Sequence, residues 1–394
     1  MNQSFDNIII RKGTSCVKHD MMNRDFGTND LLPMWVADMD LPTPSFIVDA
    51  IKERCNHHVF GYTYGGKQYF NAIVDWLDKR YNIAAQKHEL HYIPGIVAGI
   101  AFALQAFTQV GDKVIITTPV YPPFIHLPLN GKRTLVTSKL YIDNGKFNID
   151  FANLEEKIKG CKMMILSNPH NPGGTIWSKE DLEKIANLCK ANNCILISDE
   201  IHADLVLEQG QRNISFSTVS ETAKDISITF VAPSKTFNIP GLASSVAYIP
   251  NDELRNTFFN YIDGYELANG NVFAYIGAQA AFSPQGEDWL ENKLKPYLQN
   301  NLQYMADFLQ ENMPKVKFIM PQASFLVWLD FNDYNLPHSQ VKDLLINNAK
   351  VALNDGTDFG GDDYKCCFRL NVGCPKETLK QALQAICNAF EKIR

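Results

Sequence analysis

A lysine in a short turn is the residue of this chain best placed for covalent chemistry. Lys235 follows Ser234, a β-forming run Ile226–Val231 precedes the pair, and a second apolar run begins at Val246. These flanks predict that Lys235 lies just beyond a strand end, among small and apolar residues. Desolvation disfavours the charged form of an amine and lowers its pKa. A neutral amine can attack an aldehyde to form a Schiff base, although most of the 37 Lys and Arg residues simply face solvent.

Two other predicted strands end in polar side chains. The run Met163–Ser167 leads into Asn168-Pro169-His170-Asn171-Pro172-Gly173-Gly174, where two Asn-Pro steps force a tight loop. The run that begins at Cys194 is almost wholly apolar until Asp199, as is typical of a central strand covered on both faces. A buried carboxylate there is expected to have a cationic partner. In α/β sheets, ligands bind at such carboxyl ends of strands.

Two further features precede Lys235 in the sequence, a turn at Gly95 and a proline-rich segment that contains Tyr121. Leu90–Gly95 predicts an extended lead into a turn, after which Ile96 and Val97 begin a very apolar helix. The free backbone N–H groups at a helix start can bind an anion such as a phosphate, but glycine beside a buried helix is also common. Tyr121 follows the predicted strand Val114–Thr118. It either stacks on a planar ring or packs a proline-rich corner against the core.

The N-terminal part contains an extended segment, Pro33–Pro44, in which prolines at both ends disfavour a helix. It is either a packed crossing segment or an arm that brings a backbone group or Trp35 to a pocket. Thr43 or Ser45 is expected to cap the helix that follows. Further on, Tyr62 lies in a glycine-flanked turn, where its hydroxyl either reaches a phosphate or faces solvent.

The C-terminal part changes to long helices and short strands from about residue 254, which predicts a second, smaller domain. In the predicted strand Phe368–Val372, Arg369 interrupts apolar neighbours. Such an arginine either extends toward solvent or meets a carboxylate in a fork geometry. For 394 residues we expect two or three domains. We predict an N-terminal arm with part of the small domain at 1–45, a large domain at 46–285 and a small C-terminal domain at 286–394.

Composition narrows the class of protein. The net charge of −6 argues against a nucleic-acid partner, and 45% hydrophobic residues can fill a large core. The N-terminus lacks the pattern of a signal peptide, and the most apolar stretch, Ile93–Phe107, is too short to span a membrane. Nine scattered cysteines without a Cys-x-x-Cys pair favour free thiols in the cytoplasm and no metal site.

The order of these features resembles the fold-type I pyridoxal 5'-phosphate (PLP) enzymes, the aspartate aminotransferase superfamily, over nearly the whole chain. Within that superfamily the sequence is most similar to the cystathionine β-lyase-like cysteine-sulfur lyases. The residues that carry this closer resemblance are Met34–Asp40, Gly61-Tyr62-Thr63, Asp199–His202 and Ser234–Asn238. The resemblance implies an α/β fold with a mainly parallel central sheet flanked by helices in a large PLP-binding domain, plus a smaller α+β domain. It also implies a homodimer with active sites at the subunit interface.

The resemblance further implies how the cofactor ring is held. Lys235 would form the Schiff base with PLP and later shuttle protons. Asp199 would pair with the pyridinium nitrogen and keep it protonated, so that the ring acts as an electron sink. Asn171 would hydrogen-bond the phenolic oxygen, and Tyr121 would stack on the ring.

For the phosphate, the resemblance implies backbone N–H groups of Ile96 and Val97, the hydroxyl of Ser234, and Tyr62 from the neighbouring subunit. The sequence departs from some relatives here, because Ala232 stands where they carry serine and no arginine follows the lysine turn. Phosphate binding is therefore expected to depend on backbone groups and Tyr62.

For the substrate, the resemblance implies that Arg369 binds the α-carboxylate of an amino acid with help from the backbone near Ala37, while His202 supports the pocket. The expected activity is cleavage of L-cystathionine or a related cysteine S-conjugate to a thiol, pyruvate and ammonia. A class I/II aminotransferase is the nearest alternative, because its core residues are shared. A PLP-binding regulatory protein that acts through a protein partner is a third.

Overall fold

The computed structural model describes residues 4–267 and 269–391. Its main element is an eight-stranded sheet built from β2 (Leu90–Ile93), β3 (Lys113–Thr118), β4 (Thr134–Asp143), β5 (Lys146–Ile149), β6 (Cys161–Ser167), β7 (Ile195–Asp199), β8 (Ser227–Val231) and β9 (Ser245–Tyr248). The strand order is β2-β9-β8-β7-β6-β3-β4-β5. The five strands from β8 to β4 are mutually parallel, whereas β5, β9 and β2 pair antiparallel with their neighbours. Parallel strands of this kind bring their carboxyl ends to one edge of the sheet.

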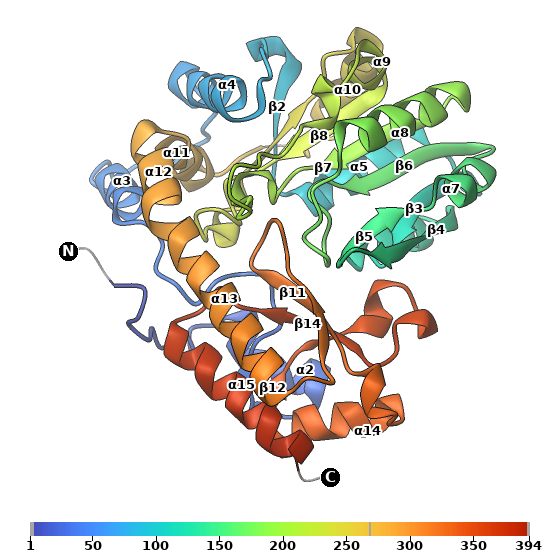
Figure 1. Cartoon of the computed structure of the whole chain (residues 1–394). Helices are drawn as coiled ribbons and strands as arrows, with labels where there is room; N and C mark the ends of the chain where they lie inside the picture. Colours follow the sequence, from blue (N-terminus) through green and yellow to red (C-terminus); the bar gives the residue numbers. More distant parts are fainter. Residues whose placement is uncertain (1–3, 268, 392–394) are drawn as a thin grey trace.

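Helices cover both faces of this sheet (Figure 1). Side chains alternate between the faces, so that Ile115 and Met164 join one hydrophobic cluster while Val114 and Met163 join another. The first face packs against α7 (Phe151–Lys157), α8 (Lys179–Ala191) and α9 (Glu221–Ile226), and the second against α5 (Ile96–Phe107), α6 (Pro123–Asn130) and α10 (Asp252–Gly264). With both faces covered, polar chemistry is confined to the strand ends.

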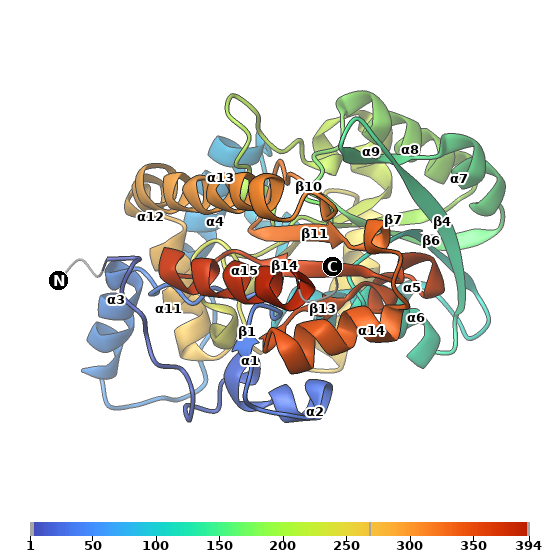
Figure 2. The same ribbon diagram turned by 60° about the horizontal axis from the view of Figure 1, so that its bottom comes forward.

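A smaller α+β unit contains a four-stranded antiparallel sheet, with β10 (Lys317–Ile319), β11 (Leu326–Asp330), β14 (Cys367–Asn371) and β13 (Asn354–Asp355) in that order. Figure 2 shows α13 (Lys295–Asn312) and α15 (Lys376–Glu391) side by side over this sheet. The helix α15 is amphipathic and buries Leu379, Leu383 and Ile386. The α/β class with a smaller α+β unit is as the sequence analysis implied, while the limits at 1–45, 46–285 and 286–394 stay predictions.

The N-terminal segment joins the smaller unit. It contains α1 (Val17–Asp20), α2 (Met22–Phe26) and β1 (Leu32–Pro33), and β1 pairs with β12 (Val351–Ala352). Residues 34–44 are irregular, as predicted, and lead into α3 (Ser45–Cys55). The predicted side-chain cap of α3 is wrong, because Pro44 occupies the N-cap. The hydroxyl of Thr43 donates instead to the carbonyl of Asn238, at 3.0 Å.

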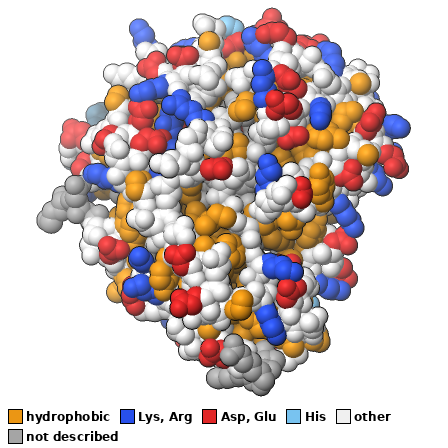
Figure 3. Space-filling view, in the orientation of Figure 1, with side chains coloured by type: hydrophobic (Ala, Val, Ile, Leu, Met, Phe, Trp, Pro, Cys, Tyr) orange, Lys and Arg blue, Asp and Glu red, His pale blue; other side chains and the backbone are white. Residues whose placement is uncertain are grey.

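The remaining helices flank these units: α4 (Lys67–Tyr81), α11 (Val272–Ala281), α12 (Pro284–Trp289) and α14 (His338–Asp343). On the face of the molecule shown in Figure 3, acidic and basic side chains are interspersed, and hydrophobic side chains gather across the middle. Within the part of the chain that the structure describes, no helix is long and apolar enough to cross a membrane.

Candidate active site

A cavity of about 170 Å³ lies at the carboxyl ends of the central strands. It brings together nine residues singled out from the sequence: Ala37, Ile96, Val97, Tyr121, Asn171, Asp199, His202, Ser234 and Lys235. These residues come from the ends of β3, β6, β7 and β8, from the start of α5, and from the irregular segment before α3. A larger hollow of about 730 Å³ lies between the β4–β5 turn and α13, but none of these nine residues lines it. Chemistry rather than size therefore identifies the smaller cavity as the site.

Lys235 lies in the loop after β8, where it lines the cavity, and its amine donates to the carbonyl oxygen of Ala37 at 2.7 Å. Burial, and after it the charge of Arg369, lower the pKa of Lys235 to about 8. The charges of Asp38 and Asp199 act in the opposite direction. The amine therefore loses its proton far more readily than an exposed lysine, as the turn predicts.

Asp199 ends β7, and its Oδ1 accepts a hydrogen bond from the backbone N–H of Ile201 at 3.0 Å. Burial raises the pKa of Asp199 to about 7, while that hydrogen bond and the charge of Lys235 lower it. Among the residues that the structure describes, no cation forms an ion pair with this carboxylate, contrary to our expectation. A buried carboxylate without a partner suits a cationic group of a ligand.

We predict that Asp199→Asn flattens the pH dependence of stability in the cofactor-free protein. The unfolded aspartate titrates near about 3.9, whereas the pKa of Asp199 in the folded chain is about 7. Between these values the folded state binds more protons than the unfolded state, so stability falls as the pH rises from about 4 to 7. The variant should melt higher than the parent at pH 7, by a few degrees, and this gap should close near pH 4. Thermal unfolding, followed by circular dichroism at constant ionic strength, measures this difference in melting temperature at each pH. A gap that does not vary with pH would contradict the assignment.

Arg369 lies on β14 and is buried, so it does not extend toward solvent. Its guanidinium donates to Asn171 Oδ1 at 3.1 Å, to the carbonyl of Trp35 at 3.2 Å and to Asn354 Oδ1 at 2.7 Å. All three acceptors are neutral, and the ring of Phe359 lies 5.0 Å away. Burial lowers the pKa of Arg369 to about 10, against the effect of Tyr121. A buried cation held only by neutral groups is prepared to receive an anion.

Sequence reasoning missed Asn354. This residue stands opposite Arg369 in the register of β13 and β14 and directs its guanidinium. No motif or spacing marks it, since the relation arises only when the two strands pair.

Two predicted aromatic residues do not enter the cavity. The indole of Trp35 donates to the carbonyl of Lys18 at 2.9 Å and packs against Phe26. Only the backbone carbonyl of Trp35 reaches the site, where it accepts from Arg369. Its side chain packs as expected for a crossing segment, while its backbone serves the pocket as expected for an arm. Tyr62 lies fully exposed in the loop before α4.

Three further residues predicted to lie around the cofactor, Tyr121, Asn171 and His202, line the cavity. Tyr121 lines the cavity after β3, and burial raises its pKa. The backbone N–H of Asn171 donates to Ser167 Oγ at 3.1 Å. The pKa of His202 falls to about 3, first through burial and then through the charges of Lys235 and Arg369, so its ring is neutral.

One end of the cavity is suited to an anion. Gly95 precedes α5 without a side-chain cap, which leaves the N–H groups of Ile96 and Val97 directed out of the first turn. Ser234 lines the same cavity. Ser244 and Ser245 line it too, although no sequence motif marks them, and the buried hydroxyl of Ser244 lies close to that of Tyr69. The hydroxyls of Ser234, Ser244 and Ser245 are hydrogen-bond donors for an anion, whereas Ala232 has no hydroxyl to contribute.

The residues present fit PLP in three places. Helix N–H groups and hydroxyls suit the phosphate, Asp199 and Tyr121 suit a flat ring with a basic nitrogen, and the Lys235 amine suits the aldehyde. The observation that supports this fit is the buried Asp199 carboxylate, which forms no ion pair with any residue that the structure describes.

Fold and site together define a PLP-dependent enzyme with the aminotransferase architecture. The chain belongs to the aminotransferase class I and II family, whose model matches residues 25–386. It is 39% identical over 387 residues to the cystathionine beta-lyase PatB of Bacillus subtilis (strain 168), covering 97% of this chain and 98% of the relative. It is 32% identical to the protein MalY of Escherichia coli (strain K12), covering 99% of both.

Solved structures of PLP-bound enzymes have the same fold as this chain. Cystalysin from Treponema denticola, which contains PLP, superposes with a TM-score of 0.95 at 29% identity over the full length of both chains. The PLP-bound C-S lyase from Staphylococcus hominis gives a TM-score of 0.91 at 34% identity over 99% of this chain and 98% of that one. A PLP-bound putative aminotransferase from Clostridium difficile 630 gives 0.95 at 36% identity over 98% of this chain and 100% of that one.

Proposed function

We propose that this protein is a carbon–sulfur β-lyase that cleaves L-cystathionine or a related cysteine S-conjugate. The observation that carries the proposal is the cavity in which the Lys235 amine, with its pKa lowered to about 8, stands close to the buried Arg369. The relatives PatB and the Staphylococcus hominis enzyme, both named as lyases, support elimination over amino transfer.

We assign the following roles to the residues that hold the cofactor. Bound PLP supplies an electron sink that stabilises negative charge at the substrate Cα. Asp199 balances the positive charge of the ring nitrogen, and Tyr121 covers the ring. Because Asn171 Oδ1 accepts from Arg369, its Nδ2 group is left as a donor for the phenolic oxygen. The phosphate is bound by backbone groups of Ile96 and Val97.

The substrate is bound and deprotonated by this chain's own side chains. Arg369 binds the α-carboxylate, and Lys235, once displaced by the amino group of the substrate, accepts the α-proton. Loss of the thiol from Cβ completes the elimination, and water converts the remaining three-carbon unit to pyruvate and ammonia. His202 is neutral and lines the pocket without taking a charge.

The test is pyruvate release from L-cystathionine with no keto acid added. A lyase produces pyruvate and thiol in equal amounts over many turnovers. An aminotransferase, the alternative favoured by the family description and by the Clostridium difficile relative, stops after one turnover without a keto-acid acceptor. Turnover that depends wholly on an added keto acid would overturn the lyase proposal.

We also propose a cytoplasmic homodimer. Val59, Phe60, Tyr62 and Tyr64 expose large side chains in one loop, which supports burial against a second copy. All nine cysteines are free, in keeping with the cytoplasm. We expect a mass in solution of twice 44.5 kDa.

If Tyr62 serves the neighbouring site, mixing inactive Lys235→Ala subunits with weakened Tyr62→Ala subunits should restore activity, because each mixed dimer regains one intact site. Sedimentation equilibrium confirms the dimer, and pyruvate release measures the recovery. Mixtures no more active than the separate variants would refute the sharing of Tyr62.

A further inference from the structure

The segment Trp35–Leu41, here called the strap, contributes Ala37 to the cavity wall and is tied to the loop that carries Lys235 and to strand β14, which carries Arg369. Asn238, three residues after Lys235, accepts from the N–H of Met39 at 3.0 Å and donates to the carbonyls of Met39 and Leu41 at 2.8 and 2.7 Å. Asn371, two residues after Arg369, donates to the carbonyls of Val36 and Asp38 at 2.6 and 2.7 Å. These hydrogen bonds fix the strap to the segment that carries Lys235 and to the strand that carries Arg369.

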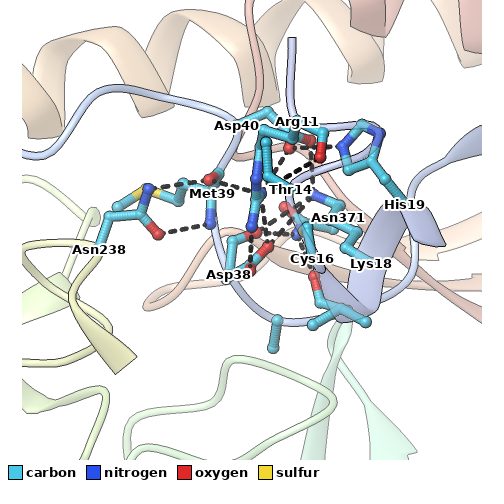
Figure 4. A network of polar contacts seen from close by, with 12 residues as sticks. Arg11, Thr14, Cys16, Lys18, His19, Asp38, Met39, Asp40, Asn238 and Asn371 are labelled. Atoms are coloured by element: carbon cyan, nitrogen blue, oxygen red, sulfur yellow. Dashed lines mark hydrogen bonds and ion pairs between the residues drawn. The ribbon is translucent and has the colours of Figure 1, made fainter. Parts of the chain in front are cut away.

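On its other side, two side chains of the strap pair with basic residues from the N-terminal arm. The five residues, here called the arm cluster, are Arg11, Lys18, His19, Asp38 and Asp40 (Figure 4). Arg11 forms a fork with Asp38, at 3.0 and 2.6 Å, and also donates to Asp40 at 2.6 Å. Lys18, which is fully buried, donates to Asp40 at 2.7 Å and to the carbonyl of Asp38 at 3.2 Å. The ring of His19 lies 3.1 Å from Asp40.

The arm cluster holds its charges firmly. Burial opposes the charge of Arg11, but its hydrogen bonds to Asp38 and the attraction of both aspartates outweigh burial and raise its pKa. Burial likewise opposes the charge of Asp40, yet Lys18, His19 and Arg11 hold its pKa well below the usual range. Two cations of the N-terminal arm, Arg11 and Lys18, therefore pair with the two carboxylates of the strap itself.

The strap acts on Lys235 through two adjacent residues. Ala37 accepts a hydrogen bond from its amine at 2.7 Å, and the carboxylate of Asp38 acts on it by charge. From the other elements around the amine, Arg369 on β14 opposes the ammonium form and Asp199 on β7 favours it. Asp38 is itself paired with two further charges, the guanidinium of Arg11 and, at 3.8 Å, the ammonium of Lys18.

We propose that Arg11 and Asp38 are positioning residues for Lys235. The arm cluster fixes the strap so that the carbonyl of Ala37 holds the amine in place. The negative charge of Asp38, partly neutralised by Arg11 at 2.6 Å and by the more distant Lys18 at 3.8 Å, then sets how readily that amine gives up its proton. This proposal rests on Lys235 as the reacting amine, but not on which substrate is cleaved.

The experiment compares Arg11→Met with Asp38→Asn. Loss of Arg11 leaves the carboxylate of Asp38 less neutralised, so the proton on Lys235 is held more tightly and its titration moves to higher pH. Loss of the Asp38 charge moves the titration to lower pH. We expect opposite shifts of roughly half a pH unit or more. If the arm cluster only held the arm in place, the titration of Lys235 would shift in the same direction in both variants, or would not shift in either.

Two readouts that do not depend on turnover measure the shift. One is the pH midpoint of the visible absorbance of the PLP-loaded enzyme. The other is the pH dependence with which acetic anhydride labels Lys235 in the cofactor-free protein, followed by peptide mass spectrometry. Arg24→Met is the matched control, because Arg24 pairs with Asp25 on the same arm at the surface and contacts no part of the strap. It should leave both midpoints unchanged.

Arg11→Lys keeps the charge and loses the fork, so its midpoint should stay close to that of the parent. This variant also protects the test against misfolding of Arg11→Met. Equal midpoints in the parent, Arg11→Met and Asp38→Asn would overturn the proposal. Opposite shifts in a protein that releases no pyruvate from L-cystathionine would support the positioning role while removing the proposed lyase activity.

Discussion

Lys235→Ala is expected to lower the rate of pyruvate formation by at least about 1000-fold, because one amine serves as both covalent anchor and base. In the structure this amine is enclosed and hydrogen-bonded to the carbonyl of Ala37, and its pKa is lowered to about 8. Within the part of the chain that the structure describes, no other lysine lines the cavity. Initial rates of pyruvate release from L-cystathionine measure the effect.

The loss should not come from unfolding. The pKa of Lys235 in the folded chain lies at about 8, below the value of about 10.4 for an unfolded lysine. Below pH 8 the buried ammonium therefore costs stability, and this cost disappears as the pH rises toward 10.4. At pH 7 the variant should melt no lower than the parent. Lys224→Ala, at an exposed position on α9, serves as the control and should retain full activity. Pyruvate release by Lys235→Ala at the parental rate would remove Lys235 from the mechanism.

Arg369→Ala should raise KM for the amino acid by about 100-fold or more while the protein still binds PLP. Two charge-assisted hydrogen bonds to a carboxylate contribute about 1.5–3 kcal/mol each, and the alanine variant loses both. The guanidinium contacts Asn171, Asn354 and the carbonyl of Trp35, which are neutral, so the variant leaves no buried acidic partner behind. Steady-state kinetics and the absorbance of bound PLP measure the two properties separately.

Arg369→Lys provides the matched comparison. It keeps a positive charge but loses the planar fork, so KM should fall between those of the parent and Arg369→Ala. Loss of PLP from Arg369→Ala, with an unchanged KM in any fraction that stays loaded, would show that the arginine holds the cofactor instead of the substrate.

The sequence alone determined the elements and most of the cavity. Alternating or continuous apolar runs show where strands lie, because burial on one or both faces of a sheet is a local pattern. Glycine and proline show where those strands end, because they restrict the backbone locally. Since parallel strands end at one edge, Asn171, Asp199 and Lys235 could be expected at a common site.

Only the tertiary structure decided how these residues are supported. The carbonyl of Ala37 meets the Lys235 amine across 198 positions of sequence, and Asn354 reaches Arg369 through strand register. Neither relation has a local signal. The same is true of Ser244, which no motif marks, and of the side chain of Trp35, which packs away from the site.

The arm cluster shows the reason most clearly. Asp38 and Asp40 are conspicuous in the sequence, but Arg11 and Lys18 resemble any other basic residue of the first 45. What makes Lys18 different is complete burial against two carboxylates, and burial at that place depends on how the arm packs on the rest of the chain. Local sequence predicts where a chain bends and which face it buries. Long-range packing decides which charged residues lie close together, and nearby charges change the pKa of a reacting amine.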